Sequence, residues 1–184
     1  VWECPDLFQL KVENENVKKW VMLVSVNPGG PNGGSGTQYF TGDFDGVKFV
    51  ADENEKTIKW LDYGPDDYAG VTWSNTPGRR KLFLGWMSNW AYAQQVPTSP
   101  WRSAMTLPRE LKLEKISNSF YLKSALTEEL NKQVTSEKTF DAVVIKDSIS
   151  IWKDSPFDAS MALIQGSIEP KDLEFSFTNS LKQQ

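Results

Sequence analysis

The first residues of the chain hold the side chains best suited to chemistry. Glu3 lies between Trp2 and Cys4, and the rigid ring of Pro5 and the carboxylate of Asp6 follow. An aromatic ring, a thiol and a proline beside a carboxyl group favour its protonated form, which is the form that a general acid requires. The alternative is that Glu3 is a terminal residue without function and Cys4 an ordinary buried thiol. On these residues alone, that alternative is the stronger.

Composition restricts any catalysis to carboxylates. The 184 residues include no histidine and a single cysteine, which excludes Ser-His-Asp and Cys-His nucleophilic sites and cysteine-built zinc sites. We therefore expect no metal and no other cofactor. With 24 acidic and 20 basic residues the net charge is -4, so nucleic acid is not an expected partner. The longest apolar runs, such as Val21 to Val24, are far shorter than the roughly 20 residues of a membrane-spanning helix.

Short strands are expected to position the chemical groups. Six runs rich in β-branched and aromatic residues recur before residue 108, and turn signals such as Asp45-Gly46 bound them. Such spacing is typical of a β-sandwich, barrel or propeller. The glycine-rich segment 29–36 is predicted to be a flexible loop, because no P-loop lysine follows it. The six predicted strands are residues 20–26, 37–40, 48–50, 71–73, 81–86 and 102–107.

A change in composition near the middle of the chain predicts two regions. Seven of the eight tryptophans precede residue 102, and only Trp152 follows. Residues 111–133 mix charged and apolar positions where the two predicted regions are connected. Within them, residues 124–133 are the best candidate for a short helix or linker. Beyond Thr139 the alternation of a half-exposed antiparallel sheet returns. Strands are predicted there at residues 140–145, 148–152, 161–168 and 173–177.

Five sequence blocks resemble those of glycoside hydrolase family 32, which includes invertases, inulinases and levanases. The block from Trp2 to Asp6 matches the family's Glu-Cys-Pro-Asp motif, in which the glutamate is the acid/base catalyst. Four further blocks follow in the family's order over residues 1 to about 111, which makes a chance similarity implausible. These four blocks are Gln38–Gly46, Leu61–Gly64 with Asp67–Ala69, Gly85–Trp90, and Pro100–Leu111.

The resemblance implies an all-β fold, a five-bladed β-propeller followed by a β-sandwich. We expect residues 1–113 to form the later blades and residues 114–184 the beginning of the sandwich. It also implies a retaining mechanism, in which an aspartate attacks the fructosyl carbon while Glu3 protonates the departing oxygen. The family's nucleophile motif, Trp-Met-Asn-Asp-Pro-Asn-Gly, and its Arg-Asp-Pro motif are absent from this sequence. Both are expected to precede Val1 in a complete enzyme, so the chain alone is predicted to be inactive.

Three further residues are predicted to bind substrate on the strength of the resemblance. Trp86 matches a position near the family's pocket, where an indole can stack on a furanose ring, although a tryptophan in a propeller strand is more often core. Asp45 could hydrogen-bond fructosyl hydroxyls, although its position before a glycine is also what a plain turn demands. Asn89, with Trp90 and Tyr92, is a weaker candidate.

Other polar residues of the matching blocks are predicted to be structural. Arg102 and Arg109 are expected to pair with carboxylates where the propeller meets the sandwich. Asp6 is expected either to orient Glu3 and its loop or to cap a turn.

The parent protein is predicted to be a bacterial exo-acting β-fructosidase that releases terminal fructose from sucrose, inulin or levan. Fructosyl transfer stays open, because it uses the same covalent intermediate. Polymeric fructans are met outside the cytoplasm, so an extracellular or periplasmic location is expected. The alternative is a non-catalytic carbohydrate-binding or structural β-protein on the same scaffold. Uncovered propeller edges could also let two chains associate.

Overall fold

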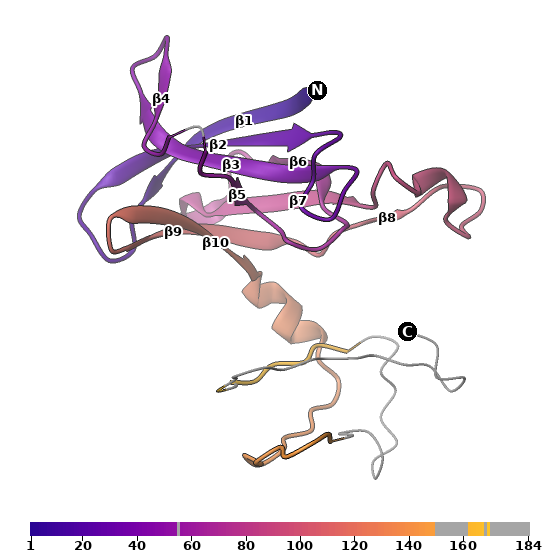
Figure 1. Ribbon diagram of the computed structural model, residues 1–184. Coiled ribbons are helices and arrows are strands. Elements are labelled where there is room, and N and C mark those ends of the chain that lie inside the picture. Colours follow the sequence, from indigo (N-terminus) through magenta and orange to yellow (C-terminus); the bar gives the residue numbers. More distant parts are fainter. Residues whose placement is uncertain (55, 150–161, 168, 170–184) are drawn as a thin grey trace. The chain divides into compact units, whose positions relative to one another are not determined.

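The computed structural model describes residues 1–54, 56–149, 162–167 and 169 (Figure 1). The chain divides into two compact units, Val1–Glu137 and Lys138–Gln184. Every strand and 3₁₀ helix of the described residues lies in the first unit, which therefore holds the candidate site. Within the same described ranges, no helix is long and apolar enough to cross a membrane.

The first sheet is an antiparallel meander made by the first third of the chain. Its order is β1-β2-β3-β4, and β5 pairs with the other half of β3 (Figure 1). From β1 to β4 each strand pairs with its neighbour in the sequence, whereas β5 returns to pair with β3. The strands are β1 (Trp2–Lys11), β2 (Lys18–Val26), β3 (Gly36–Phe44), β4 (Phe49–Ala51) and β5 (Lys59–Trp60).

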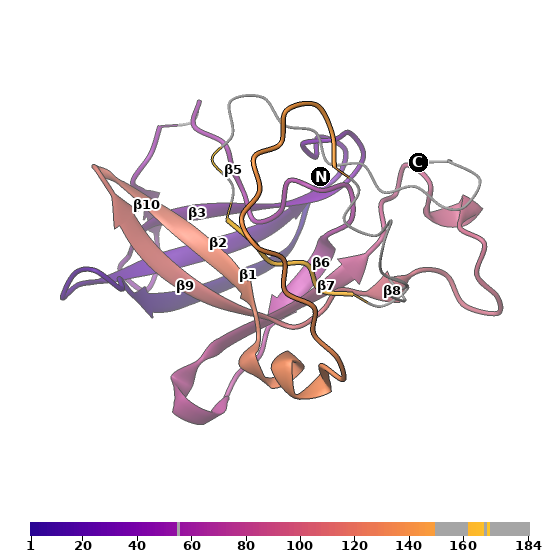
Figure 2. The same ribbon diagram turned by 90° about the horizontal axis from the view of Figure 1, so that it is seen from below.

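The second sheet repeats this plan with the order β6-β7-β9-β10, and β8 pairs with the end of β7. β10 is an edge strand of this sheet, and Figure 2 shows the β9–β10 hairpin in the foreground. The strands are β6 (Tyr68–Thr72), β7 (Lys81–Met87), β8 (Ala104–Met105), β9 (Arg109–Ile116) and β10 (Ser119–Leu126). The 3₁₀ helices are η1 (Pro77–Arg79), η2 (Ala93–Gln95) and η3 (Glu128–Gln133).

Alternating apolar residues on the two sheets build one shared core. In β9, Leu111 and Leu113 are buried while Lys112 between them is exposed, which is the period of two that a half-buried strand requires. Phe83 in β7 is fully buried, and its truncation to alanine would cost about 3–5 kcal/mol. The buried cluster comprises Phe8, Val12, Val21, Leu23, Tyr39 and Leu61 from the first sheet and its loops, and Phe83, Leu111, Leu113 and Leu122 from the second.

The first strands of the two sheets, β1 and β6, are joined by hydrogen bonds. The Asp6 carboxylate accepts bonds from the Thr72 backbone N–H at 2.7 Å and from the Thr72 hydroxyl at 2.6 Å. Gly70 in β6 lets this strand pack closely against Phe83 in β7, because a Cβ at position 70 would lie 2.1 Å from the Phe83 ring. Asp6 therefore joins the two sheets and does not cap a turn. Two five-stranded antiparallel sheets with adjacent first strands form two neighbouring blades of a partial β-propeller, the fold that the family resemblance implied.

All six strands predicted before residue 108 correspond to observed strands, but three long strands were missed. β1 was missed because Pro5 and its charged neighbours do not resemble a strand, and a β-bulge accommodates them. β9 and β10 fall where a join between domains was predicted. Their charged residues face solvent while alternate leucines enter the core. Of the short helix or linker predicted at residues 124–133, residues 128–133 form η3, whereas residues 124–126 belong to β10.

The predicted boundary between residues 113 and 114 falls inside β9. Because β9 pairs with both β7 and β10, residues 114–126 complete the second blade, and the first compact unit extends to Glu137. The strand predicted at residues 140–145 is wrong: this segment has no strand pairing in the structure. Residues 162–167 of the strand predicted at 161–168 likewise have no strand pairing. The strand predicted at 173–177 and most of that at 148–152 lie outside the described residues, so a sandwich after Glu137 stays a prediction.

Candidate active site

Glu3 lies where the two blades meet. It pairs with Ser25 in β2, and a β-bulge follows it, with Cys4 in the left-handed conformation at φ 47°. The Glu3 side chain is exposed, and its Oε2 accepts a hydrogen bond from the hydroxyl of Tyr68 in β6. Its Oε1 has no hydrogen-bond partner among the described residues. One oxygen is therefore held by the protein while the other is open to a ligand.

A second bulge, in β6, brings Tyr68 to Glu3. The register of β6 shifts between Tyr68 and Val71, and Ala69 within it has φ 49°. The Ala69 N–H donates to the Ser25 hydroxyl oxygen at 3.0 Å, which fixes the bulge against the first blade. Bulges re-aim side chains and are common beside active sites. Here two facing bulges direct a carboxylate and a phenol at each other.

Tyr68 is a permanent hydrogen-bond donor to Glu3. Burial raises the pKa of Tyr68 far above its usual value, and the hydrogen bond and charge of Glu3 raise it further. The hydroxyl therefore keeps its proton throughout the range in which proteins function, and it orients the carboxyl group. Sequence reasoning missed Tyr68, because only the contact between blades reveals that it reaches Glu3.

Two tryptophans continue the site beyond Tyr68. Trp86 in β7 lies opposite Tyr68 in the strand pairing, and their rings meet edge to face with centroids 6.4 Å apart. The Trp90 ring lies 5.2 Å from that of Trp86 and is half exposed. The structure therefore brings the predicted Trp86 next to the glutamate's partner, and it adds Trp90 to the same aromatic surface.

Asn89 does not face this surface. It is 1% exposed, and its Oδ1 accepts hydrogen bonds from the backbone N–H groups of Ser35 and Ala91 at 3.1 and 2.9 Å. Its Nδ2 donates to the carbonyl oxygens of Pro65, Gly33 and Ser35 at 2.8–3.2 Å. No polar atom of Asn89 is left for a sugar. The predicted substrate-binding role is therefore wrong, and Asn89 instead clamps the glycine-rich loop against the second blade.

Asp45 lies in a turn far from Glu3. Its Oδ1 accepts the backbone N–H groups of Val47 and Lys48 at 2.8 and 2.7 Å, and these bonds, that of Lys48 first, lower the pKa of Asp45. Glu3 pairs with Ser25 in β2, and Ser25 pairs with Thr37 in β3. Asp45 lies eight residues beyond Thr37 along the chain, which places it roughly 25 Å from Glu3. The predicted contact with substrate is therefore wrong for Asp45, which stabilises the β3–β4 turn.

A buried carboxylate supports the site from behind. Asp67, next to Tyr68 in the sequence, is 2% exposed, and its Oδ1 has no hydrogen-bond partner among the described residues. The Arg109 guanidinium lies 3.4 Å from Asp67 Oδ2 but only 2.6 Å from Asp62 Oδ2. Burial raises the pKa of Asp67 to about 7, against the lowering effect of Arg109 and with a further rise from Asp62. Arg109 thus pairs with carboxylates as predicted, although it does so within the blade.

The other predicted structural arginine, Arg102, forms no ion pair with the residues that the structure describes. Arg102 donates to the backbone carbonyl oxygens of Val96 and Thr98, both at 2.9 Å, and so closes its own loop. Over the part of the chain that the structure describes, no group of three or more His, Cys, Asp or Glu side chains is placed to hold a metal ion.

Comparisons with known proteins agree with this geometry. Residues 1–124 match the family described as "Glycosyl hydrolases family 32 N-terminal domain". A levanase of Bacillus subtilis is 46% identical over 182 residues, which is 96% of this chain and 27% of the levanase. The extracellular exo-inulinase inuE of Aspergillus niger is also 46% identical, over 125 residues, 64% of this chain and 23% of the relative.

Solved structures show the same likeness. The crystal structure of exo-inulinase from Aspergillus awamori is 41% identical, with a TM-score of 0.66 over 72% of this chain and 27% of the inulinase. A β-fructofuranosidase from Schwanniomyces occidentalis, in complex with fructosyl-erythritol, is 41% identical with a TM-score of 0.60, over 70% of this chain and 26% of that chain. The chain thus spans about a quarter of the length of the relatives that it matches.

Proposed function

We propose, since the chain belongs to glycosyl hydrolase family 32, that its parent enzyme hydrolyses terminal β-D-fructofuranosides with Glu3 as the acid/base catalyst. One observation carries the proposal: Glu3 lies at the junction of two blades, with Oε2 held by Tyr68 and Oε1 open. An exposed carboxyl oxygen on a rigid strand can reach a glycosidic oxygen without displacing a structural partner. The family assignment supplies the reaction class, and the geometry supports the role of this residue.

The proposed reaction uses Glu3 twice. The Glu3 carboxyl gives its proton to the departing oxygen while a carboxylate nucleophile bonds to the fructosyl carbon, and the resulting Glu3 carboxylate then deprotonates the attacking water. In a retaining enzyme the two carboxyl groups lie about 5 Å apart. The nucleophile motif is absent from these 184 residues, so the second carboxylate has to come from another part of the parent enzyme.

Trp86 and Trp90 form the proposed sugar-binding surface. An indole face offers a flat apolar surface for the C–H groups of a furanose ring. Trp86 is partly buried against Tyr68, which fixes its orientation close to Glu3. Trp90 is held by its backbone N–H, which donates to the Ser35 hydroxyl oxygen at 3.2 Å, while its ring is half exposed. Both rings are thus ordered before any sugar binds.

Fructans are the substrates that we favour, and sucrose is the alternative within the same reaction. The two sequence relatives described above are named levanase and exo-inulinase, and the match to the bacterial levanase extends over almost the whole chain. The inulinase is named as extracellular, which supports a secreted parent enzyme. A bacterial parent is supported by the longer levanase match. Transfer to a sugar acceptor would use the same intermediate as hydrolysis.

A chimeric enzyme tests the role of Glu3. In the Bacillus subtilis levanase, the segment that aligns with this chain is replaced by this chain, and kcat/KM is measured with sucrose, levan and an aryl β-fructofuranoside. Glu3→Gln should lower kcat/KM for sucrose and levan by ~10²–10⁴. It should lower the value for the aryl substrate much less, because a good leaving group needs no proton. Glu137→Gln, an exposed carboxylate without a partner in the described residues, is the matched control. Equal losses with all three substrates would rule out the acid role.

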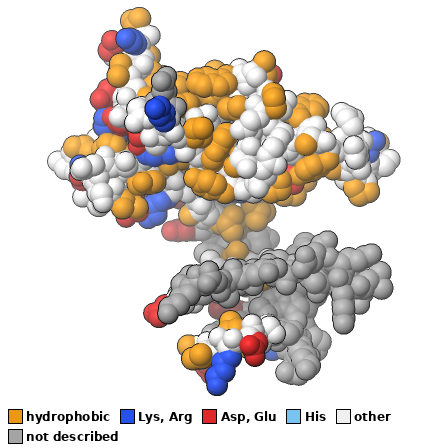
Figure 3. Space-filling view, viewed as in Figure 1, with side chains coloured by type: hydrophobic (Ala, Val, Ile, Leu, Met, Phe, Trp, Pro, Cys, Tyr) orange, Lys and Arg blue, Asp and Glu red, His pale blue; other side chains and the backbone are white. Residues whose placement is uncertain are grey.

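The isolated chain tests the prediction that it is inactive by itself. Fructose release from sucrose, inulin and levan is measured for the chain and for Glu3→Gln, together with the mass of the assembly. Release that the variant lacks would mean that a nucleophile is present, which contradicts an inactive fragment. Binding of fructans without release would fit the non-catalytic alternative for the chain alone. Figure 3 shows hydrophobic side chains reaching the surface across the viewed face of the first unit, so the mass also tests self-association.

A further inference from the structure

The two strands that carry Glu3 and Tyr68 are not paired with each other. β1 and β6 belong to different sheets, so no backbone ladder sets the position of one strand against the other. Among the described residues, three hydrogen bonds join them: the bond from Tyr68 to Glu3 and two bonds from Thr72 to Asp6. The meeting of Glu3 and Tyr68 therefore depends on contacts made by side chains.

A β-bulge separates the site residue from the joining residue on each strand. In β1 the register shifts between Glu3 and Asp6, and in β6 it shifts between Tyr68 and Val71, one residue before Thr72. A bulge disrupts the ladder locally and bends its strand. The directions in which Glu3 and Tyr68 leave their strands therefore depend on where the strands are held just beyond the bulges, which is where Asp6 meets Thr72.

The contact between Asp6 and Thr72 is strong enough to hold the strands there. A single carboxylate oxygen, Asp6 Oδ2, accepts the Thr72 backbone N–H at 2.7 Å and the Thr72 hydroxyl at 2.6 Å. Hydrogen bonds to a charged acceptor are roughly twice as strong as neutral ones. Both residues are partly buried, so water competes less than at an exposed pair. The carboxylate thus fixes the backbone and the side chain of Thr72 together.

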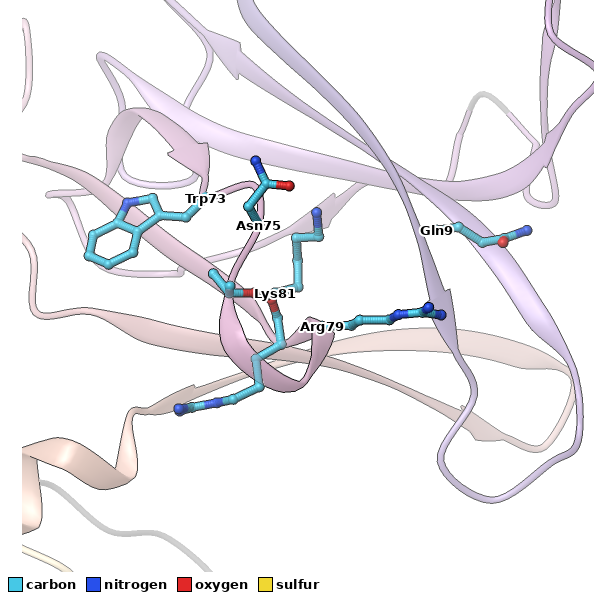
Figure 4. Close-up of a pocket in the computed structure, with 7 residues that line it drawn as sticks. Gln9, Trp73, Asn75, Arg79 and Lys81 are labelled. Atoms are coloured by element: carbon cyan, nitrogen blue, oxygen red, sulfur yellow. Dashed lines mark hydrogen bonds between the residues drawn. The ribbon is translucent and has the colours of Figure 1, made fainter.

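Past this contact the two strands separate. Gln9, three residues beyond Asp6, and Trp73, which follows Thr72, line a pocket of about 280 Å³. Figure 4 shows them on opposite sides, with the Trp73 indole directed away from Gln9. No hydrogen bond between described residues joins β1 to β6 on that side. Asp6 and Thr72 therefore form the last connection between the strands before they diverge.

We propose that Asp6 is a positioning residue for the acid/base catalyst, an inference that rests on the proposed function of Glu3. The Asp6 carboxylate holds Thr72 and so fixes the bulge of β6 relative to that of β1. This keeps the Tyr68 hydroxyl on Glu3 Oε2 and leaves Oε1 directed to the glycosidic oxygen. A catalytic group displaced by about 1 Å can cost ~10²-fold in rate, so Asp6 affects proton transfer without touching the substrate.

The first test follows Glu3 in the full 184-residue chain. The carbon NMR signal of the Glu3 carboxyl group is measured, and Tyr68→Phe gives its position without the hydrogen bond. Asp6→Ala should move the signal toward that position. Asp6→Asn should leave it near its original position, because an amide oxygen can accept the same two bonds.

A matched control separates this contact from any lost carboxylate. Asp45→Ala also removes a carboxylate that accepts two hydrogen bonds, but it does so roughly 25 Å from Glu3, so the Glu3 signal should not move. Urea denaturation confirms that each variant is folded.

The second test measures kcat/KM in the chimeric levanase. Asp6→Ala should lower kcat/KM for sucrose and levan by ~10- to 100-fold. It should lower the value for the aryl β-fructofuranoside much less, because a good leaving group depends less on a correctly placed acid. Asp6→Asn should keep most of the activity. Thr72→Val keeps the backbone donor and loses only the hydroxyl, so its loss should be smaller than that of Asp6→Ala.

The two tests separate this inference from the proposed function. The positioning role is overturned by a Glu3 signal that Asp6→Ala leaves in place, or by equal losses of kcat/KM with all substrates. An Asp6→Asn variant as impaired as Asp6→Ala would also overturn it, because Asp6 would then act through its charge. Equal losses with all substrates in Glu3→Gln would instead overturn the acid role of Glu3, and the carboxyl signal would still decide whether Asp6 positions this side chain.

Discussion

Two regions beside each other at the junction of the two blades use the same kinds of residue for different roles. The mouth of the site, formed by Glu3, Trp86 and Trp90, keeps side-chain surface exposed and leaves Glu3 Oε1 open. The support behind it, formed by Asn89 and Asp67, is at most 2% exposed. Burial, more than residue type, therefore separates side chains that can meet a substrate from side chains that hold the framework. Both regions include residues of sequence blocks that are typical of the family, so a motif alone does not say which role a residue has.

The largest expected effect comes from breaking the support at Asn89. Asn89→Ala leaves the N–H groups of Ser35 and Ala91 and three carbonyl oxygens without their partner. Unsatisfied buried polar groups cost about 1–3 kcal/mol each before relaxation, so we expect a loss of ~3 kcal/mol in the free energy of unfolding. Urea denaturation measures this loss. Asn16→Ala, at an exposed turn position, should change the value by less than ~0.5 kcal/mol. A stable Asn89→Ala variant with weakened fructan binding would reverse the assignment.

Asp67 in the support should make stability depend on pH. The folded pKa of about 7 lies above the usual value of 3.8, so between these values the folded state binds a proton that the unfolded state has lost. This contribution to stability is complete below about pH 4 and is lost as pH rises to about 7. From pH 5 to pH 7.5 the loss should be ~2.5 kcal/mol. Asp67→Asn has no such proton to lose, so it should show a smaller loss over the same range.

The Asp67 measurement is a set of urea midpoints at several pH values for the chain and for Asp67→Asn. Asp141→Asn is the matched control, because Asp141 is exposed. It should reproduce the pH dependence of the unmodified chain. Identical slopes in the chain and in Asp67→Asn would show that Asp67 is ionised in the folded state. In that case Arg109 compensates its burial fully.

The sequence predicted the blades well, because their strands carry local signals. Turn residues such as Asp45 and alternating apolar residues as in β7 depend on neighbours in the chain, so six strands were identified from local signals. The catalytic candidate Glu3 was predicted from the family resemblance and not from its local pattern. β9 was misassigned because its charged residues look like a linker until β7 and β10 are placed beside it. The roles of Asn89 and Tyr68 depend on contacts between residues 54 and 65 positions apart, which no local pattern encodes.

The smallest expected effect, and the sharpest test of the mouth, is Tyr68→Phe in the chimeric levanase. The change removes one hydroxyl from Glu3 and keeps the ring that packs against Trp86, so kcat/KM should fall by ~10-fold, about 1.4 kcal/mol. The loss should be smaller with the aryl β-fructofuranoside, because a good leaving group depends less on a correctly oriented acid. Tyr92→Phe, which removes a hydroxyl bonded to Asp66, should leave kcat/KM unchanged for every substrate. Equal losses for Tyr68→Phe with all substrates would mean that Tyr68 packs the mouth without orienting Glu3.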